Sequence, residues 1–200
     1  MTPQKKLIHS LYQIGVVQFG TFTLKSGQTS SIYINLRKII SYPSILKSIA
    51  MLMWEKAKSC PFDLICGVPY TAMPIATCIS LDHDIPMIMR RKEKKEYGTK
   101  QLIEGVFEIN QSCLIIEDVI TTGSSILETI TDVEYAGLHV KDVIALLDRE
   151  QGGKEIIQKR YQLHTILTLT EVLNELLNGA VLNSTEKNII KQFLSERSTS

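Results

Sequence analysis

Long apolar runs, net charge and paired cysteines are scarce in this chain, and each absence narrows the class of protein. No apolar run approaches the roughly 20 residues that a membrane span needs, and residues 1–15 are basic without the apolar centre of a secretion signal. We therefore expect a cytoplasmic protein that does not associate with membranes. Lys and Arg total 22 against 21 Asp and Glu, so no global positive field attracts nucleic acid.

The four cysteines and four histidines show no spacing typical of a metal site or a disulfide framework. No C-x-x-C pair occurs, and Cys66, Cys78 and Cys113 lie in apolar segments, where a free thiol behaves as a small hydrophobic side chain. We predict structural thiols, assign no role to any histidine and expect no zinc site held by the protein. Repeats and Pro/Gly/Ser linkers are also missing, so residues 1–200 are expected to form one domain.

What the chain does have is an alternation of apolar runs with segments of helical period, which favours an α/β fold. Helices are predicted near residues 7–14, from Pro43, after a turn within 70–80, over about 123–136, and as two amphipathic segments at the C-terminal end. Strands are predicted at residues 30–40, 63–68, 85–90, 106–109, 113–117, 143–148 and 163–169. This order predicts a central, mostly parallel sheet with helices on both faces.

One predicted strand, within CLIIEDVITTGSSI (Cys113–Ile126), ends in two adjacent acids followed by a loop of small polar residues. In a parallel sheet, ligands bind beyond the carboxyl ends of the strands, at loops that lead into helices. Hydroxyls and N–H groups at such a helix N-terminus hold a phosphate, while Glu117 and Asp118 accept hydrogen bonds from neutral hydroxyls. No Walker A sequence is present. The pattern indicates a ribose 5-phosphate; the alternative is an ordinary N-capped helix with solvated acids.

A second segment, MRRKEKKEYGTKQLIEG (Met89–Gly105), contains more basic than acidic residues. It is either a solvated charge run or a loop that bends at Gly98. A basic loop beside a phosphate site has an electrostatic use. It can close over a diphosphate leaving group, exclude water and neutralise the charge that grows as the bond breaks.

The first segment resembles the motif with which type I phosphoribosyltransferases bind phosphoribosyl diphosphate (PRPP), and the second resembles the catalytic loop of orotate phosphoribosyltransferases. Three further segments resemble that family in the same order: FTLKSGQTSSIYINLR, GVPYTAMPIA and LLDREQGG. The chain is similar above all to the domain that animals fuse to orotidine 5'-phosphate decarboxylase in UMP synthase. The resemblance implies the type I phosphoribosyltransferase fold with a small N-terminal hood.

The resemblance also implies a reaction and its participants. Orotate and PRPP would give orotidine 5'-monophosphate and diphosphate in de novo pyrimidine (UMP) synthesis, with Mg²⁺ carried by PRPP and not by a protein cage. The enzyme would be a homodimer in which the basic loop of one subunit closes over the PRPP site of its partner. No nucleic acid is expected to take part.

Site residues follow from the same resemblance. Lys95 and Asp118 would be catalytic, Lys95 as the main cation at the leaving group. The predicted PRPP-binding residues are Lys25, Tyr70, Thr71, Arg91, Lys92, Lys95, Tyr97, Glu117, Asp118, Val119, Ile120, Thr121, Thr122, Gly123, Ser124 and Ser125. The predicted orotate-binding residues are Lys25, Tyr33, Ile34, Thr121 and Arg149. A flat, carboxylated ring suits a bidentate cation, which is the role of Arg149.

Three positions depart from the pattern of many bacterial members: Tyr97 stands where they have histidine, Thr71 where they have lysine and Glu117 where they have aspartate. All three also occur in the animal-type domain, so they mark a subclass. Two other functions remain as alternatives. A purine-type phosphoribosyltransferase is disfavoured by LKSG and LDREQGG. A non-catalytic regulator that keeps the PRPP-binding fold is disfavoured because the chain has no added DNA-binding segment or basic face.

Overall fold

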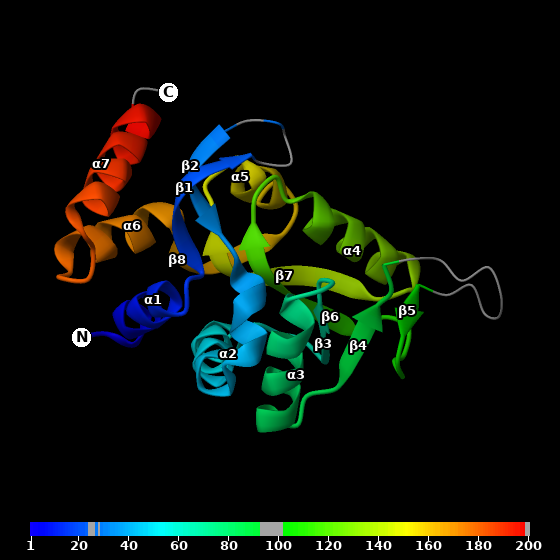
Figure 1. The fold of residues 1–200 in the computed structure, drawn as a ribbon. Helices are drawn as coiled ribbons and strands as arrows, with labels where there is room; N and C mark the ends of the chain where they lie inside the picture. The colour runs from blue at the N-terminus through cyan, green and yellow to red at the C-terminus, as the bar shows by residue number, and fades with distance from the viewer. Residues whose placement is uncertain (24–26, 28, 93–101, 199–200) are drawn as a thin grey trace.

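The computed structural model describes residues 1–23, 27, 29–92 and 102–198 (Figure 1). In chain order the elements are α1 (Pro3–Gln13), β1 (Val17–Thr23), β2 (Thr29–Ile34), the 3-10 helix η1 (Leu36–Ser41), α2 (Pro43–Ala57), β3 (Leu64–Gly67), α3 (Ala72–His83), β4 (Met87–Arg90), β5 (Ile103–Glu104), β6 (Ser112–Ile120), α4 (Ser124–Tyr135), β7 (His139–Asp148), α5 (Gly153–Ile157), β8 (Gln162–Thr168), α6 (Leu169–Asn178) and α7 (Ser184–Ser198).

The main sheet has six strands in the order β5-β4-β3-β6-β7-β8. The pairs β4–β3, β3–β6, β6–β7 and β7–β8 are parallel, and β4–β5 is antiparallel. This confirms the predicted mostly parallel sheet. Because every parallel strand runs the same way, the loops after β3, β6 and β7 emerge at one edge of the sheet, where ligands bind in such folds.

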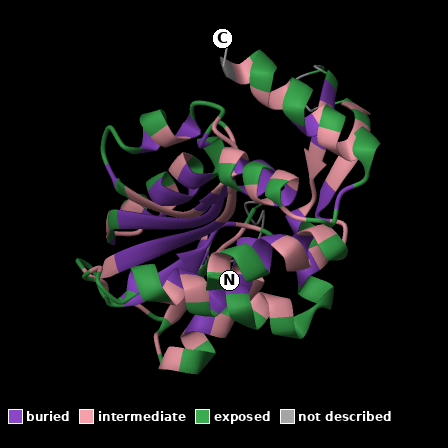
Figure 2. Cartoon of the chain, turned by 90° about the vertical axis from the view of Figure 1, so that its left-hand side faces the viewer, coloured by how far each residue is buried: buried purple, intermediate pink, exposed green. Residues whose placement is uncertain are grey.

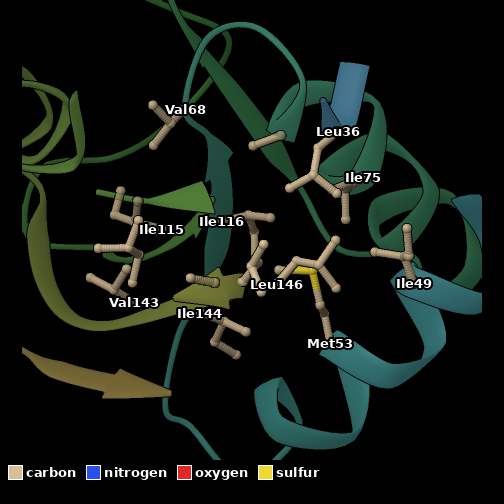
Figure 3. Packing of buried hydrophobic residues seen from close by; sticks show 14 of the residues in the cluster. Leu36, Ile49, Met53, Val68, Ile75, Ile115, Ile116, Val143, Ile144 and Leu146 are labelled. Carbon is tan, nitrogen blue, oxygen red and sulfur yellow. The ribbon is translucent and has the colours of Figure 1, made fainter. Parts of the chain in front are cut away.

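Helices cover both faces of the sheet, and the strands between them are buried (Figures 1 and 2). Neighbouring residues on a strand point to opposite faces. On β6, Ile116 lies on the side of Met53 from α2 and Ile75 from α3, whereas Ile115 lies on the other side with Val143 of β7 (Figure 3). Helix α4 packs against β6 and β7 on that second face. The apolar runs of the sequence therefore became strands buried on both faces, as expected for a parallel sheet.

The N-terminal part forms the predicted hood. Strands β1 and β2 make a separate antiparallel hairpin that pairs Val17 with Ile34 and Thr23 with Thr29, with a register shift between Phe19 and Phe22. Helix α7 packs against β2 although it lies at the far end of the sequence. Figure 1 shows the hairpin beside α5 and the ends of the central strands. The hood therefore closes one side of the region where the site loops emerge.

Two predicted strands were wrong, one in part and one entirely. The strand predicted over residues 30–40 ends at Ile34, and residues 36–41 form η1. Leu36 and Ile39 are both buried at a spacing of three, which suits a 3-10 turn and not the alternation of a strand. The prediction of a strand at residues 106–109 was also wrong. Val106 and Ile109 are exposed, and β5 ends before Gly105, whose φ of +124° is not a strand conformation.

The sequence patterns did not indicate β1, β5 or α5, which are short or irregular in hydrophobic pattern. The helices predicted from Pro43 and near residues 123–136 are confirmed as α2 and α4. Over the residues that the structure covers, no helix combines the length and the apolar composition that crossing a membrane requires.

Candidate active site

The segment after β6 forms a small hollow at the N-terminus of α4. Residues 121–123 turn the chain, and Gly123 occupies the N-cap position with φ +81°, a left-handed conformation that costs glycine little. Because glycine has no side chain to cap the helix, the first N–H groups of α4 are left for an anion. The hydroxyls of Thr122 and Ser124 lie 3.0 Å apart on exposed residues. The hollow is lined by Glu117, Val119, Thr121, Thr122, Gly123, Ser124, Ser125 and Ile126, and we call it the cradle.

Two acids near the end of β6 stand in different environments beside the cradle. The Glu117 side chain is 5% exposed, and its Oε1 accepts a hydrogen bond from the Asp118 N–H (N to O, 2.9 Å). Burial, and then the negative charge of Asp118, raise the pKa of the Glu117 carboxyl well above its ordinary value. Asp118 is partly exposed. The pair therefore offers hydrogen-bond acceptors in two different electrostatic settings at one strand end.

The loop between β7 and α5 packs directly on the cradle. Arg149 N–H donates to the Ile120 carbonyl (N to O, 2.9 Å), and Gly153 N–H donates to the Thr121 carbonyl (3.0 Å). A Cβ atom at Gly153 would lie 2.5 Å from the Thr121 oxygen and 2.7 Å from the Gly123 nitrogen, so this approach requires glycine. The phosphate motif and the motif around Arg149 are therefore one structural unit.

Arg149 is half-buried beside the hood. Its Nε atom is buried and has no hydrogen-bond partner among the described residues. Burial, and then repulsion by Arg197, lower the pKa of the Arg149 guanidinium, while Tyr33 acts in the opposite direction. Arg149 thus lies near enough to Tyr33 of β2 for their charges to interact, and the role of both residues in binding orotate stays a prediction. A buried N–H without a partner is costly, which makes this position suitable for a ligand acceptor.

Arg197, to which the sequence analysis gave no role, holds the loop that carries Arg149. From α7 its guanidinium donates to the carbonyls of Arg149 (N to O, 3.3 Å) and Glu150 (2.7 Å). Glu150 has φ +55°, and its carboxylate accepts hydrogen bonds from the Thr170 N–H (2.9 Å) and hydroxyl (2.8 Å). The loop is therefore fixed from both α6 and α7. No local pattern marks Arg197, because the contact depends on how a distant helix packs.

The predicted diphosphate contacts lie on the loop after β3 and at the end of β4. Lys92 Nζ lies 5.1 Å from the centre of the Tyr70 ring, a cation–π distance. Arg91 Nη1 lies 3.2 Å from Glu104 Oε1 and so has an ion-pair partner. Thr71 is buried while Tyr70 is exposed. Tyr70 and Lys92 are thus brought together, whereas the Thr71 side chain has little access to a ligand.

Other predicted residues fall into two groups. Ile34 ends β2 next to Tyr33, and Ile120 is buried in the core, so its side chain contacts no ligand. Lys25, Lys95 and Tyr97 lie outside the described residues, and the roles given to them stay predictions. Arg90, to which no role was given, pairs with Asp132 of α4 (N to O, 2.6 Å) and links β4 to that helix.

Solved structures define the class. The chain resembles the UMP synthase of Leishmania donovani with a TM-score of 0.86 and 33% identity, over 96% of this chain and 42% of that one. The fold, with its cradle at the carboxyl edge of the sheet, is that of a type I phosphoribosyltransferase. No protein-family model matches the chain.

Curated relatives define the family. The chain is 47% identical to the bovine uridine 5'-monophosphate synthase over 193 residues, which cover 95% of this chain and 40% of that protein. It is 41% identical to the orotate phosphoribosyltransferase of Chlamydia felis over 182 residues, covering 90% of this chain and 88% of that protein. The chain belongs to the orotate phosphoribosyltransferase family, glycosyltransferase-type enzymes of pyrimidine biosynthesis. It spans less than half of the bovine and Leishmania proteins but most of the chlamydial one.

Proposed function

We propose that this chain transfers the phosphoribosyl group of PRPP to orotate and releases diphosphate. The observation that carries the proposal is the contact between two motifs: the cradle after the acid pair, and the loop that places Arg149 beside it. A phosphate site and a site for a carboxylated ring then share one wall. We treat residues 1–200 as one domain with this activity, acting in the cytoplasm.

In this proposal the cradle binds the 5-phosphate of PRPP. The hydroxyls of Thr122 and Ser124 and the N–H groups of the first turn of α4 donate to phosphate oxygens, and the helix dipole adds to their attraction. Asp118 accepts hydrogen bonds from the ribose hydroxyls together with Glu117. These contacts fix the ribose so that its C1 carbon faces the orotate end.

At the other end Arg149 binds the orotate carboxylate. Its unpaired Nε supplies a donor, and the half-buried guanidinium strengthens the attraction because less water screens it. Orotate can attack as an anion, so no strong protein base is needed. The transition state has oxocarbenium character at C1, and most of the rate enhancement would come from alignment and from stabilising the departing diphosphate.

Magnesium would enter with PRPP. Mg²⁺ prefers phosphate oxygens and waters to an all-protein cage, and when bound it neutralises the growing charge on the diphosphate. In the described part of the chain, no group of three acids, histidines or cysteines converges at the cradle. The acceptor oxygens of Glu117 and Asp118 fit a ribose that carries its own metal, so these residues would orient the sugar and leave the metal to PRPP.

Four candidate acceptors test which compound receives the phosphoribosyl group. Diphosphate release should be measured from PRPP with orotate, uracil, hypoxanthine and adenine in separate reactions. Release with orotate alone is the expected result, because only orotate presents a carboxylate to Arg149. Release with a purine would support the purine-type alternative, and no release with any base would favour a binding protein.

Lys95→Ala tests the cation assigned to the leaving group. This variant should lower kcat by on the order of 10²-fold, since a charge aimed at a leaving group acts mainly in the transition state.

We further propose a homodimer with shared sites, in which Lys95 serves the cradle of the partner. Met51 on α2 and Leu81 on α3 are exposed apolar side chains on two helices that pack on each other, and they are candidates for contacts between subunits. Inactive Lys95→Ala and Asp118→Asn proteins should regain roughly a quarter of wild-type activity after subunit exchange, because half the dimers are mixed and half of their sites are intact. Two batches of Lys95→Ala, mixed as the control, should stay inactive. Failure of the first mixture, with exchange confirmed by mass, would exclude shared sites.

A further inference from the structure

Three side chains far from the cradle converge at the other end of the main sheet. Cys60 lies in the loop after α2, Asp142 on β7 and His164 on β8. His164 Nε2 lies 2.8 Å from Asp142 Oδ1 and 3.6 Å from Cys60 Sγ. One ligand atom from each of the three residues lies within 4.8 Å of the others. These residues are widely separated along the chain, so no metal-ligand spacing marks them in the sequence.

The fold explains why they meet. Strands β7 and β8 are parallel, with Asp142 opposite Gln162 and Ile144 opposite His164. Asp142 and His164 therefore point to the same face, since side chains two residues apart share a face. Helix α2 packs against β7 and β8. Cys60, three residues beyond the end of α2, is thereby brought to the same point.

The charges at this point are incompletely balanced. Asp142 is only 4% exposed, yet its Oδ2 has no hydrogen-bond partner in the part of the chain that the structure describes. A buried carboxylate oxygen without a partner is costly. A cation bound beside Cys60 Sγ and His164 Nε2 would give this carboxylate the partner that it lacks.

We propose that Cys60, Asp142 and His164 bind a Zn²⁺ ion. Zinc takes sulfur, imidazole nitrogen and carboxylate oxygen in tetrahedral geometry, with bond lengths that set sulfur and nitrogen about 3.5 Å apart, close to the 3.6 Å seen here. The nitrogen and oxygen, now 2.8 Å apart, would need to separate by only about 0.5 Å. On binding, the Cys60 S–H bond breaks, the thiolate pair of electrons goes to Zn²⁺ and the proton goes to solvent. The proton that His164 Nε2 shares with Asp142 Oδ1 leaves Nε2, and Nδ1 takes a proton from solvent, so the Nε2 lone pair binds the ion. The His164 side chain is 30% exposed, so water can take the fourth position.

The site acts on stability and not on turnover. The ion would join the loop after α2 to two strands, so it binds only the folded chain and shifts unfolding by mass action. Asp142 lies six residues before the end of β7, which puts it roughly 20 Å from the loop that carries Arg149. We therefore expect Zn²⁺ to raise the melting temperature and to leave the kinetic constants for orotate and PRPP unchanged.

The test uses the untagged, chelator-treated full chain without substrates. Zn²⁺ is titrated in competition with a chromophoric chelator, and Co²⁺ is added separately, because a thiolate bound to Co²⁺ gives a charge-transfer absorption band. We expect one ion per chain and the Co²⁺ band. At free Zn²⁺ 100-fold above Kd, the melting temperature should rise by about 5–10 °C.

Matched variants assign the ligands. Cys60→Ser should weaken Zn²⁺ binding by at least about 100-fold and abolish the Co²⁺ band, since a lost ligand costs no less than a lost supporting group. Asp142→Asn, which keeps the side-chain volume, should also weaken binding. Cys78→Ser, which removes another half-buried thiol on α3, should change nothing. Absence of one-ion binding in the wild type, or equal binding by Cys60→Ser and Cys78→Ser, would overturn the proposal.

Discussion

The two ends of the candidate active site are built in different ways. The phosphate end comes from one continuous segment, the end of β6 and the first turn of α4, and its donors are hydroxyls and backbone N–H groups. The orotate end is assembled from β2 of the hood, the loop after β7 and a guanidinium from α7. Damage to the first should therefore act locally. Damage to the second can start from a residue that touches no substrate.

Gly153 lies where the two ends meet, so its replacement should have the largest effect. In Gly153→Ala the new methyl group would meet backbone atoms of Thr121 and Gly123 at 2.5 and 2.7 Å. Backbone cannot yield as a flexible side chain does, and we expect a loss of about 3 kcal/mol in the free energy of unfolding. Binding of both PRPP and orotate should weaken, measured by titration calorimetry on the folded fraction.

Gly152→Ala is the matched control for that prediction. Gly152 has φ +84°, so alanine is strained there by about 1–2 kcal/mol. Its added Cβ would meet no atom within 4 Å. The variant should lose some stability and keep its PRPP affinity. If Gly152→Ala weakened PRPP binding as much as Gly153→Ala, the contact between the two loops would not be the cause.

Arg149→Ala tests whether the two ends of the site bind their substrates independently. We expect a raised KM for orotate, by a factor that corresponds to about 1.5–3 kcal/mol, because a hydrogen bond to a charged group is lost. The KM for PRPP should hardly change, since the cradle is intact. Loss of PRPP binding with orotate binding preserved would move the orotate site elsewhere. Steady-state kinetics with each substrate varied in turn decide between these outcomes.

The same contrast explains what the sequence could predict. The cradle was predicted in order and position because all of its residues are neighbours in the chain and the strand, loop and helix are each signalled locally. Arg149 was assigned to orotate through a motif, and that role stays a prediction. The contact of its loop with Thr121 and Gly123 is made by Gly153, which spacing alone cannot place. Arg197 was missed, because a contact from a distant helix to the carbonyls of the loop leaves no local pattern.

The group of Cys60, Asp142 and His164 was missed for the same reason. Its members come from a loop and two strands, and only the parallel register of β7 and β8 brings two of them to one face. The prediction of a strand at residues 106–109 shows the opposite error, because a local pattern was present and the structure did not follow it. Its apolar residues suit a strand, but no neighbouring strand pairs with it among the described residues, since β5 at residues 103–104 forms the edge next to β4.

Glu117→Gln tests whether the phosphate end trades stability for function. The raised pKa of Glu117 means that the folded state holds its proton more tightly than the unfolded state does. The contribution of Glu117 to the free energy of unfolding of the wild type is therefore fully present below the ordinary pKa of 4.5, and it is lost as the pH rises above that value. The glutamine variant should be more stable by about 1–2 kcal/mol at pH 7 and equal to wild type below pH 4.5. PRPP affinity should fall, because an amide accepts less strongly than a carboxylate.

Chemical denaturation at several pH values checks that prediction. A stability difference that stayed constant from pH 4 to pH 8 would show that packing and not ionisation is the cause. Asp142→Asn is not a suitable comparison, because Asp142 is paired with His164.

Arg197→Ala should have the smallest effect and is the most direct test of the assembled end. Arg197 lies on α7 and donates to the carbonyls of Arg149 and Glu150 at 3.3 and 2.7 Å, so its loss frees the loop without removing any group assigned to orotate. We expect a rise of about 5-fold in the KM for orotate, equivalent to about 1 kcal/mol for such hydrogen bonds, with kcat and the KM for PRPP unchanged. Arg160→Ala, at a mostly exposed arginine, is the control and should leave all three constants unchanged.

Arg197→Lys then separates two causes of such a rise in the KM for orotate. Lysine keeps the positive charge near Arg149 but cannot hold two carbonyls in the fixed geometry of a guanidinium. If the lysine variant behaves like alanine, Arg197 positions the loop. If it behaves like wild type, its charge attracts orotate and the positioning role is wrong.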